Sequence, residues 1–117
     1  MSEIIQRLHE VDFDDLFRHA VTAAKDVILH GWDSVKEHVK KAAKNLRDAG
    51  VSIAKMLATG VISQEEARIL LEDERLVVRM QLRTVLAGAI LTAQRVVAAI
   101  LGVFRDAFNR IMGFDLV

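Results

Sequence analysis

Apolar side chains recur along this chain at alternating steps of three and four residues, which is the spacing of one face of an α-helix. A first series runs from Phe13 to Leu57, and a second runs from Val78 to Ile111. The composition agrees with this pattern, because proline is absent and the aromatic residues are limited to five Phe and one Trp. The sequence therefore predicts an all-α fold, in which residues 1–117 form a single helical domain.

The clearest boundary between helices lies just after the first series ends. Gly60 suits the left-handed position that follows the end of a helix. Ser63, followed by Glu66, matches a capping box, in which each side chain binds the other residue's backbone N–H. We therefore expect one helix to end just before Gly60 and the next to begin after Ser63.

Two further glycines leave the architecture open. If the chain turns only after residue 59, it forms a long antiparallel hairpin with helices at about 12–59 and 63–113, which associates into a larger helical bundle. If it also breaks at Gly31 and Gly50, it forms a compact four-helix bundle. The hairpin is favoured, because the apolar spacing continues through both glycines without a slip, whereas a loop normally resets it.

In the hairpin, a count outward from the turn identifies the residues that face each other. Phe13 then faces Phe108, and Phe17 faces Phe104. Each pair on one helix is spaced by four residues, so both rings of a pair lie on the same side of that helix. The sequence therefore predicts that these four rings form one aromatic cluster at the open end of the hairpin.

Residues 84–104 form an apolar run that only Gln94 and Arg95 interrupt. The same count places Asp26 opposite Arg95, so the sequence predicts a buried ion pair between them, within one chain or across an interface. The run also carries a second apolar stripe, which a two-helix hairpin leaves uncovered. This stripe predicts an oligomer interface made of Leu86, Ile90, Val97, Leu101, Phe104 and Phe108.

The surplus apolar surface leads to three hypotheses for the function. The first is a self-associating structural or scaffold subunit of a homo-oligomeric helical assembly, whose partner is another copy of the chain. The second is a membrane-associated or membrane-inserting hairpin that buries residues 84–104 in lipid, at a cost of roughly 2.5–3.5 kcal/mol for Arg95 near the centre of the span. The third is a module that binds another helical protein through the same surface.

The remaining features argue against catalysis. The chain has no cysteine, which excludes a thiol nucleophile and a thiolate-bound metal. Its glycines stand singly, and no serine is spaced with a histidine and an acid, so we expect no enzymatic activity and no cofactor. A series of acidic and histidine residues is interpreted as a solvated polar face without a metal: Asp15, His19, Asp26, His30, Asp33 and Glu37.

The charge balance bears on partners and location. Sixteen basic and sixteen acidic residues leave no net charge, which argues against a nucleic-acid partner. Acidic residues also interrupt the one dense basic strip, which contains Lys36, Lys40, Lys41, Lys44 and Arg47. The first residues lack the basic and apolar segments of a secretory signal, so we expect a cytoplasmic protein, with membrane association as the alternative.

Overall fold

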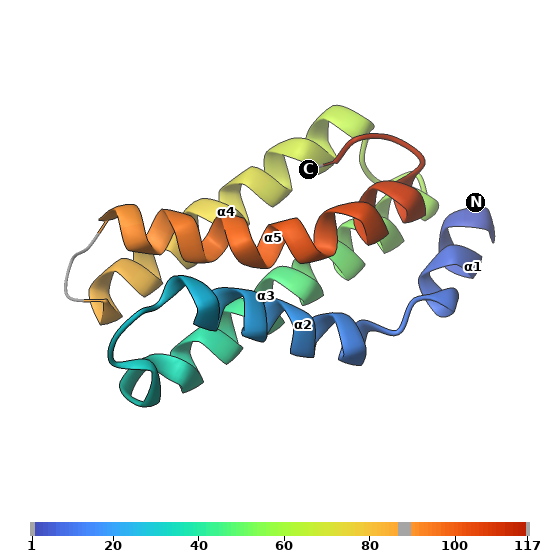
Figure 1. Ribbon diagram of the computed structural model, residues 1–117. Helices are drawn as coiled ribbons and strands as arrows, with labels where there is room; N and C mark the ends of the chain where they lie inside the picture. The colour runs from blue at the N-terminus through green and yellow to red at the C-terminus, as the bar shows by residue number, and fades with distance from the viewer. Residues whose placement is uncertain (1, 87–89, 117) are drawn as a thin grey trace.

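The computed structural model describes the backbone of residues 2–86 and 90–116, and the side chains of residues 3–86 and 92–116. Within these ranges all regular structure is helical, which confirms the predicted all-α class. The helices found there are α1 (Ser2–Glu10), α2 (Phe13–Val27), α3 (Trp32–Ala58), α4 (Gln64–Val85) and α5 (Ile90–Met112) (Figure 1).

Helices α2 to α5 form a bundle in which each helix runs antiparallel to the one before it (Figure 1). α2 packs along α5 and α3, and α4 packs along α3 and α5. α1 lies at one end of the bundle against α3 and α5, where Nε of Arg7 donates a hydrogen bond to the carbonyl of Ile111 at 3.1 Å. Apolar side chains from all five helices meet in one core.

The predicted long hairpin is wrong, because both of its helices are divided near the middle. The first stops at Val27 and resumes at Trp32, and the second stops at Val85 and resumes at Ile90. Unbroken helices of the predicted lengths would form a rod of about 75 Å at 1.5 Å per residue, whereas the longest dimension of the protein is 44 Å. The hairpin is folded back on itself. α2 still lies beside α5 and α3 beside α4, but the α2–α5 pair also packs on the α3–α4 pair.

The alternative prediction of a break at Gly31 is confirmed. Gly31 has a φ of 77°, a left-handed conformation that glycine adopts without steric cost, and it immediately precedes α3. The connection between α2 and α3 covers residues 28–31. The connection has four residues, about as many as one turn of an α-helix. The apolar spacing in the sequence therefore continues across it, although the helix itself stops.

The second break of that alternative, at Gly50, is wrong, since α3 continues through this residue to Ala58. Gly50 is buried, and the ring of Phe108 from α5 lies directly over its backbone. A Cβ atom added to Gly50 would lie 2.2 Å from Cζ of Phe108, far inside van der Waals contact. The glycine is therefore explained by the close approach of α5 and not by a turn.

The predicted boundary between α3 and α4 is confirmed in its hydrogen bonds. Gly60 has a φ of 74°, and the N–H of Val61 donates to the carbonyl of Met56 at 3.0 Å, as in a Schellman motif. The N–H of Glu66 donates to Oγ of Ser63 at 3.1 Å, and the N–H of Ser63 donates to Oε1 of Glu66 at 3.0 Å. These reciprocal bonds are the capping box, and they start α4 directly after the turn.

The second apolar stripe is covered within the same chain, because α5 packs against α2, α3 and α4 at once. The predicted oligomer interface is therefore wrong at the four positions that are at most 5% exposed, namely Val97, Leu101, Phe104 and Phe108. Leu86 is half-buried and packs against the core. The side chain of Ile90 lies outside the described residues.

The membrane hypothesis required residues 84–104 to form one continuous span. This run is divided between α4 and α5, which are antiparallel (Figure 1). In the described ranges, no helix combines the length and the apolarity needed to cross a bilayer.

The aromatic cluster is confirmed in part. The ring centres of Phe13 and Phe108 lie 6.3 Å apart, as the count predicted, and Phe104 stacks on Phe108 at 5.3 Å. Phe17 is half-buried, with the guanidinium of Arg47 at 5.5 Å from its ring centre, and no ring contact joins it to Phe104 among the described residues. The predicted register survives at Phe13 and Phe108 because folding the hairpin double leaves α2 beside α5.

The predicted buried ion pair is wrong within this chain. Asp26 and Arg95 are both exposed, and no salt bridge joins them in the described part of the molecule. Burial was inferred from the apolar residues on either side of Arg95 in sequence. Val96, Val97 and Ile100 are buried on the inner side of α5, whereas Arg95 lies on its solvent side.

Arg68→Ala is expected to lower the free energy of unfolding more than Arg95→Ala does. Nε of Arg68 donates to the carbonyl of Asp115 at 3.1 Å, and its guanidinium lies 4.9 Å from the ring centre of Phe114, so its loss should cost about 1 kcal/mol. Loss of the exposed Arg95 should change stability by less than about 0.5 kcal/mol. Thermal unfolding followed by circular dichroism measures both, and a larger loss for Arg95→Ala would mean that Arg95 is buried in solution.

Candidate protein-interaction surface

α4 has one side packed into the bundle and one side that faces outward. Its inward side is formed by Ala67, Leu71, Val78 and Leu82, all at most 4% exposed. Among the described helices, α4 packs against α3 and α5 alone. The outward side is therefore available to a partner.

Large apolar side chains that the core does not use lie on this outward side. Met80 is 66% exposed, Ile69 54%, Val77 48% and Leu70 37%. Ile69 and Met80 are eleven residues apart, which is about three helical turns, so both lie in one row along the helix. We call these four residues the α4 outer face. The other large hydrophobic residues of comparable exposure in the described ranges lie in connections between helices: Leu29 and Val61.

The charged residues of α4 are segregated along its length. Residues 75–83 contain three arginines and no acid, whereas residues 65–74 contain one arginine and five acids, Glu65, Glu66, Glu72, Asp73 and Glu74. Acids in the first turn and bases in the last turn complement the helix dipole. That effect falls off within one turn, so it does not account for the acids at positions 72–74.

Asp73 lies within the α4 outer face, one turn after Ile69 and seven residues before Met80. Asp73 is exposed and makes no hydrogen bond or ion pair with any described residue. Its neighbour Glu72, in contrast, pairs with Arg75. The apolar row of α4 is thus interrupted at its centre by one uncompensated negative charge.

Two of the five residues of the basic strip on α3 pair with acids. Nζ of Lys40 lies 3.5 Å from Oε2 of Glu37. Arg47 contacts Asp48 at 3.1 Å and reaches Asp14 of α2 at 3.8 Å. These pairs make the strip a surface of mixed charge, which does not favour a polyanionic partner.

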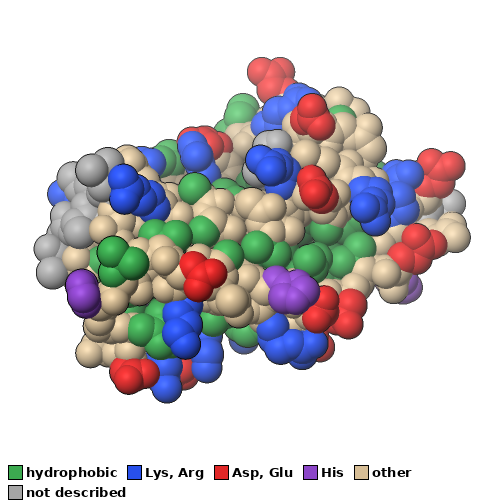
Figure 2. All heavy atoms as spheres, in the orientation of Figure 1, with side chains coloured by type: hydrophobic (Ala, Val, Ile, Leu, Met, Phe, Trp, Pro, Cys, Tyr) green, Lys and Arg blue, Asp and Glu red, His purple; other side chains and the backbone are tan. Residues whose placement is uncertain are grey.

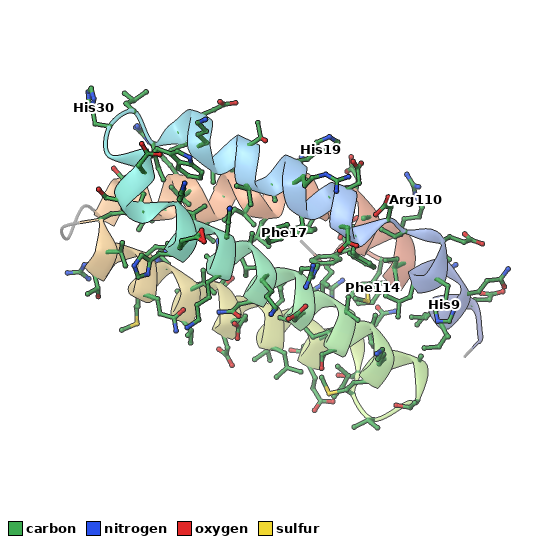
Figure 3. The ribbon with its side chains drawn as sticks, turned by 90° about the horizontal axis from the view of Figure 1, so that it is seen from below. His9, Phe17, His19, His30, Arg110 and Phe114 are labelled. Atoms are coloured by element: carbon green, nitrogen blue, oxygen red, sulfur yellow. The ribbon has the colours of Figure 1, made fainter. Side chains whose placement is uncertain are left out.

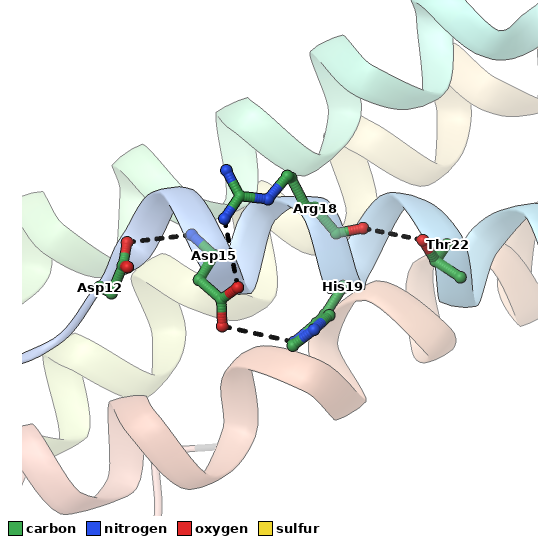
Figure 4. A network of polar contacts seen from close by, with 5 residues as sticks. All are labelled: Asp12, Asp15, Arg18, His19 and Thr22. Carbon is green, nitrogen blue, oxygen red and sulfur yellow. Dashed lines mark hydrogen bonds and ion pairs between the residues drawn. The ribbon is translucent and has the colours of Figure 1, made fainter.

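The histidine and acidic residues do not converge on one site. Asp15 accepts a hydrogen bond from Arg18 at 3.3 Å and lies 3.7 Å from Nδ1 of His19 in the polar network at the start of α2 (Figure 4). His9, His19 and His30 lie at separate places along the molecule (Figure 3). In the described part of the chain, no three histidine or acidic side chains are grouped so that they could hold a metal ion.

A cleft of about 460 Å³ between α1 and α3 is a second candidate for binding. Its polar lining includes His9, whose side chain is seen below α1 in Figure 3. The apolar lining residues already pack against the core; they are Ile5, Leu8, Phe13 and Val51. The cleft therefore offers less unused apolar surface than the α4 outer face.

The face formed by α2 and α5 differs from that of α4. Hydrophobic side chains there form a narrow row along the seam between the two helices, with charged side chains on both sides (Figure 2). Val27 and Val103, which belong to these helices, are only partly exposed and pack against the core. This is the exposure expected of core residues seen at a helix–helix seam.

The chain matches no protein-family model. Comparison with curated proteins and with solved structures likewise finds no similar protein. The function is therefore inferred from the chemistry of the chain's own surface.

The surplus apolar surface lies on α4, whereas the sequence predicted it on the second stripe of residues 84–104. α4 itself carries two apolar rows, one with Leu71, Val78 and Leu82 and one with Ile69 and Met80. A helix at the edge of a bundle buries only one such row, so the second row in the sequence indicates an interaction surface.

Proposed function

We propose that this protein is a self-associating helical subunit without catalytic activity, which meets other copies of itself through the α4 outer face. The observation that carries this proposal is the concentration of exposed apolar side chains on one side of α4. Contact between two such faces removes Ile69, Val77 and Met80 from water, which is the main driving force of protein association.

The surface is modest, and its size sets the expected strength of the contact. One helix face buries less area than the roughly 1,200–2,000 Å² of a standard stable interface. Association also has to offset the loss of translational and rotational freedom. The self-association is therefore reversible and depends on protein concentration, and each protomer has a core of its own.

Met80→Glu is expected to shift the protein toward the monomer, because it places a charge in the most exposed apolar position of the α4 outer face. Leu29→Glu is the matched control, since Leu29 is even more exposed, at 82%, but lies in the connection between α2 and α3. Static light scattering at increasing concentration should give a mass above 13.1 kDa for the unmodified chain and for Leu29→Glu, but not for Met80→Glu.

Two outcomes of this experiment contradict the proposal. If the unmodified chain stays at 13.1 kDa at every concentration, it does not self-associate, and the α4 outer face is better explained as a binding surface for a different helical protein. If the two variants lose association equally, the contact between copies does not depend on α4.

A further inference from the structure

We infer that two copies pair through α4 in antiparallel orientation about a two-fold axis, with Ile69 of each copy against Met80 of the other. This inference rests on the proposed self-association and adds the partner geometry. It follows from the order of charges along α4 and from the spacing of its exposed apolar residues.

The charge order distinguishes the two ways in which α4 can meet a second α4. A parallel pair places the acids of residues 65–74 against the same acids, and the arginines of residues 75–83 against the same arginines. An antiparallel pair places the acidic part of each helix against the basic part of the other. Opposite charges across an interface favour the correct arrangement and like charges oppose the wrong one.

The apolar residues determine the register of the antiparallel pair. If Ile69 of one copy lies opposite Met80 of the other, the two-fold axis requires the reciprocal contact as well. In the same register, Leu70 lies near Val77 of the other copy, and Glu65 lies near Arg83. The apolar contacts then lie on either side of the two-fold axis, and the pairs of Glu65 with Arg83 lie beyond them at the two ends of the interface.

Asp73 lies close to the two-fold axis in this register, so the two Asp73 carboxylates approach each other. Their repulsion weakens the contact and keeps it reversible. Two unit charges about 7 Å apart in water interact by an amount that corresponds to about a threefold change in Kd. Asp73→Asn is therefore expected to tighten self-association about threefold, whereas a contact that does not involve α4 would leave Kd unchanged.

Engineered thiols test the geometry directly, because the chain has no cysteine of its own. Ile69→Cys and Met80→Cys are made as separate variants, both at exposed positions, and are oxidised mildly alone and as an equimolar mixture. The antiparallel pair predicts a disulfide only in the mixture, between position 69 of one copy and position 80 of the other. Each variant alone stays uncross-linked, since its two thiols are displaced by about 16 Å along the helix, beyond the roughly 7 Å limit between Cα atoms.

Leu29→Cys serves as the control for random collision of exposed thiols. Cross-linking of Ile69→Cys alone would overturn the inference in favour of a parallel pair. Absence of the mixed disulfide while light scattering still detects association of the reduced variants would also overturn it, but would leave the proposed self-association standing. Absence of association in the unmodified chain would instead remove the proposed function together with the inference.

Discussion

Phe108→Ala is expected to lower the free energy of unfolding by about 3–5 kcal/mol, the largest loss among the single substitutions considered. The Phe108 side chain is completely buried, stacks on Phe104 at 5.3 Å and approaches Phe13 at 6.3 Å. It also covers the backbone of Gly50, so its removal leaves a cavity bordered by three helices. Urea unfolding followed by circular dichroism measures this loss, which is a large share of the 5–15 kcal/mol stability of a typical domain.

Phe17→Ala is the matched control for Phe108→Ala. Phe17 has the same side chain but is half-buried beneath Arg47, so its truncation removes less buried surface and leaves a site that water can fill. We expect the loss for Phe17→Ala to be less than half of that for Phe108→Ala. Equal losses for the two variants would contradict the central position of Phe108 in the core.

Gly50→Ala is expected to lower the free energy of unfolding by about 1–3 kcal/mol, although alanine is the better helix former. The added methyl group would meet the Phe108 ring at 2.2 Å, and a fully buried ring has little room to move. Gly102→Ala is the control, because Gly102 also lies within a helix but has no atom within 4 Å of an added Cβ. That substitution should raise stability by about 0.5–1 kcal/mol.

Opposite signs for the two glycine variants would therefore support the close approach of α3 and α5 at Gly50. The penalty of Gly50→Ala should also shrink in a Phe108→Leu background, because residues in direct contact are energetically coupled. If Gly50→Ala stabilised the protein as Gly102→Ala does, Phe108 would have to lie elsewhere in solution.

Local features of the fold were predictable from the sequence because they depend on neighbouring residues. The Schellman turn at Gly60 and the capping box of Ser63 and Glu66 follow from short-range hydrogen bonds. The contact of Phe13 with Phe108 was found by counting along two paired helices, and it survives because α2 and α5 remain paired.

The two divisions of the hairpin were harder to predict, because their cause lies in tertiary packing. The connection at residues 28–31 preserves the apolar spacing, so periodicity alone does not reveal it. α4 stops at Val85 inside the most apolar part of the sequence, without a proline to end it. Folding there covers the second stripe of α5, which a two-helix hairpin would leave in water.

The candidate surface was missed for the same reason. Ile69 and Met80 were predictable as helix residues, but the side of α4 that faces the core depends on how α3 and α5 are placed around it. Asp26 and Arg95 show the converse, since both were expected inside and both are exposed. The sequence therefore predicted that these segments form amphipathic helices, but it did not predict which of their sides face the core.

Self-association through α4 is tested most directly by a dilution series of ¹⁵N–¹H NMR spectra, which locates the contact residue by residue. We expect the amide signals of the α4 outer face, at Ile69, Leu70, Val77 and Met80, to shift progressively with protein concentration. Signals of α2, on the other side of the bundle, should stay constant. Spectra that do not change with concentration, or shifts confined to another helix, would contradict the proposed role of α4.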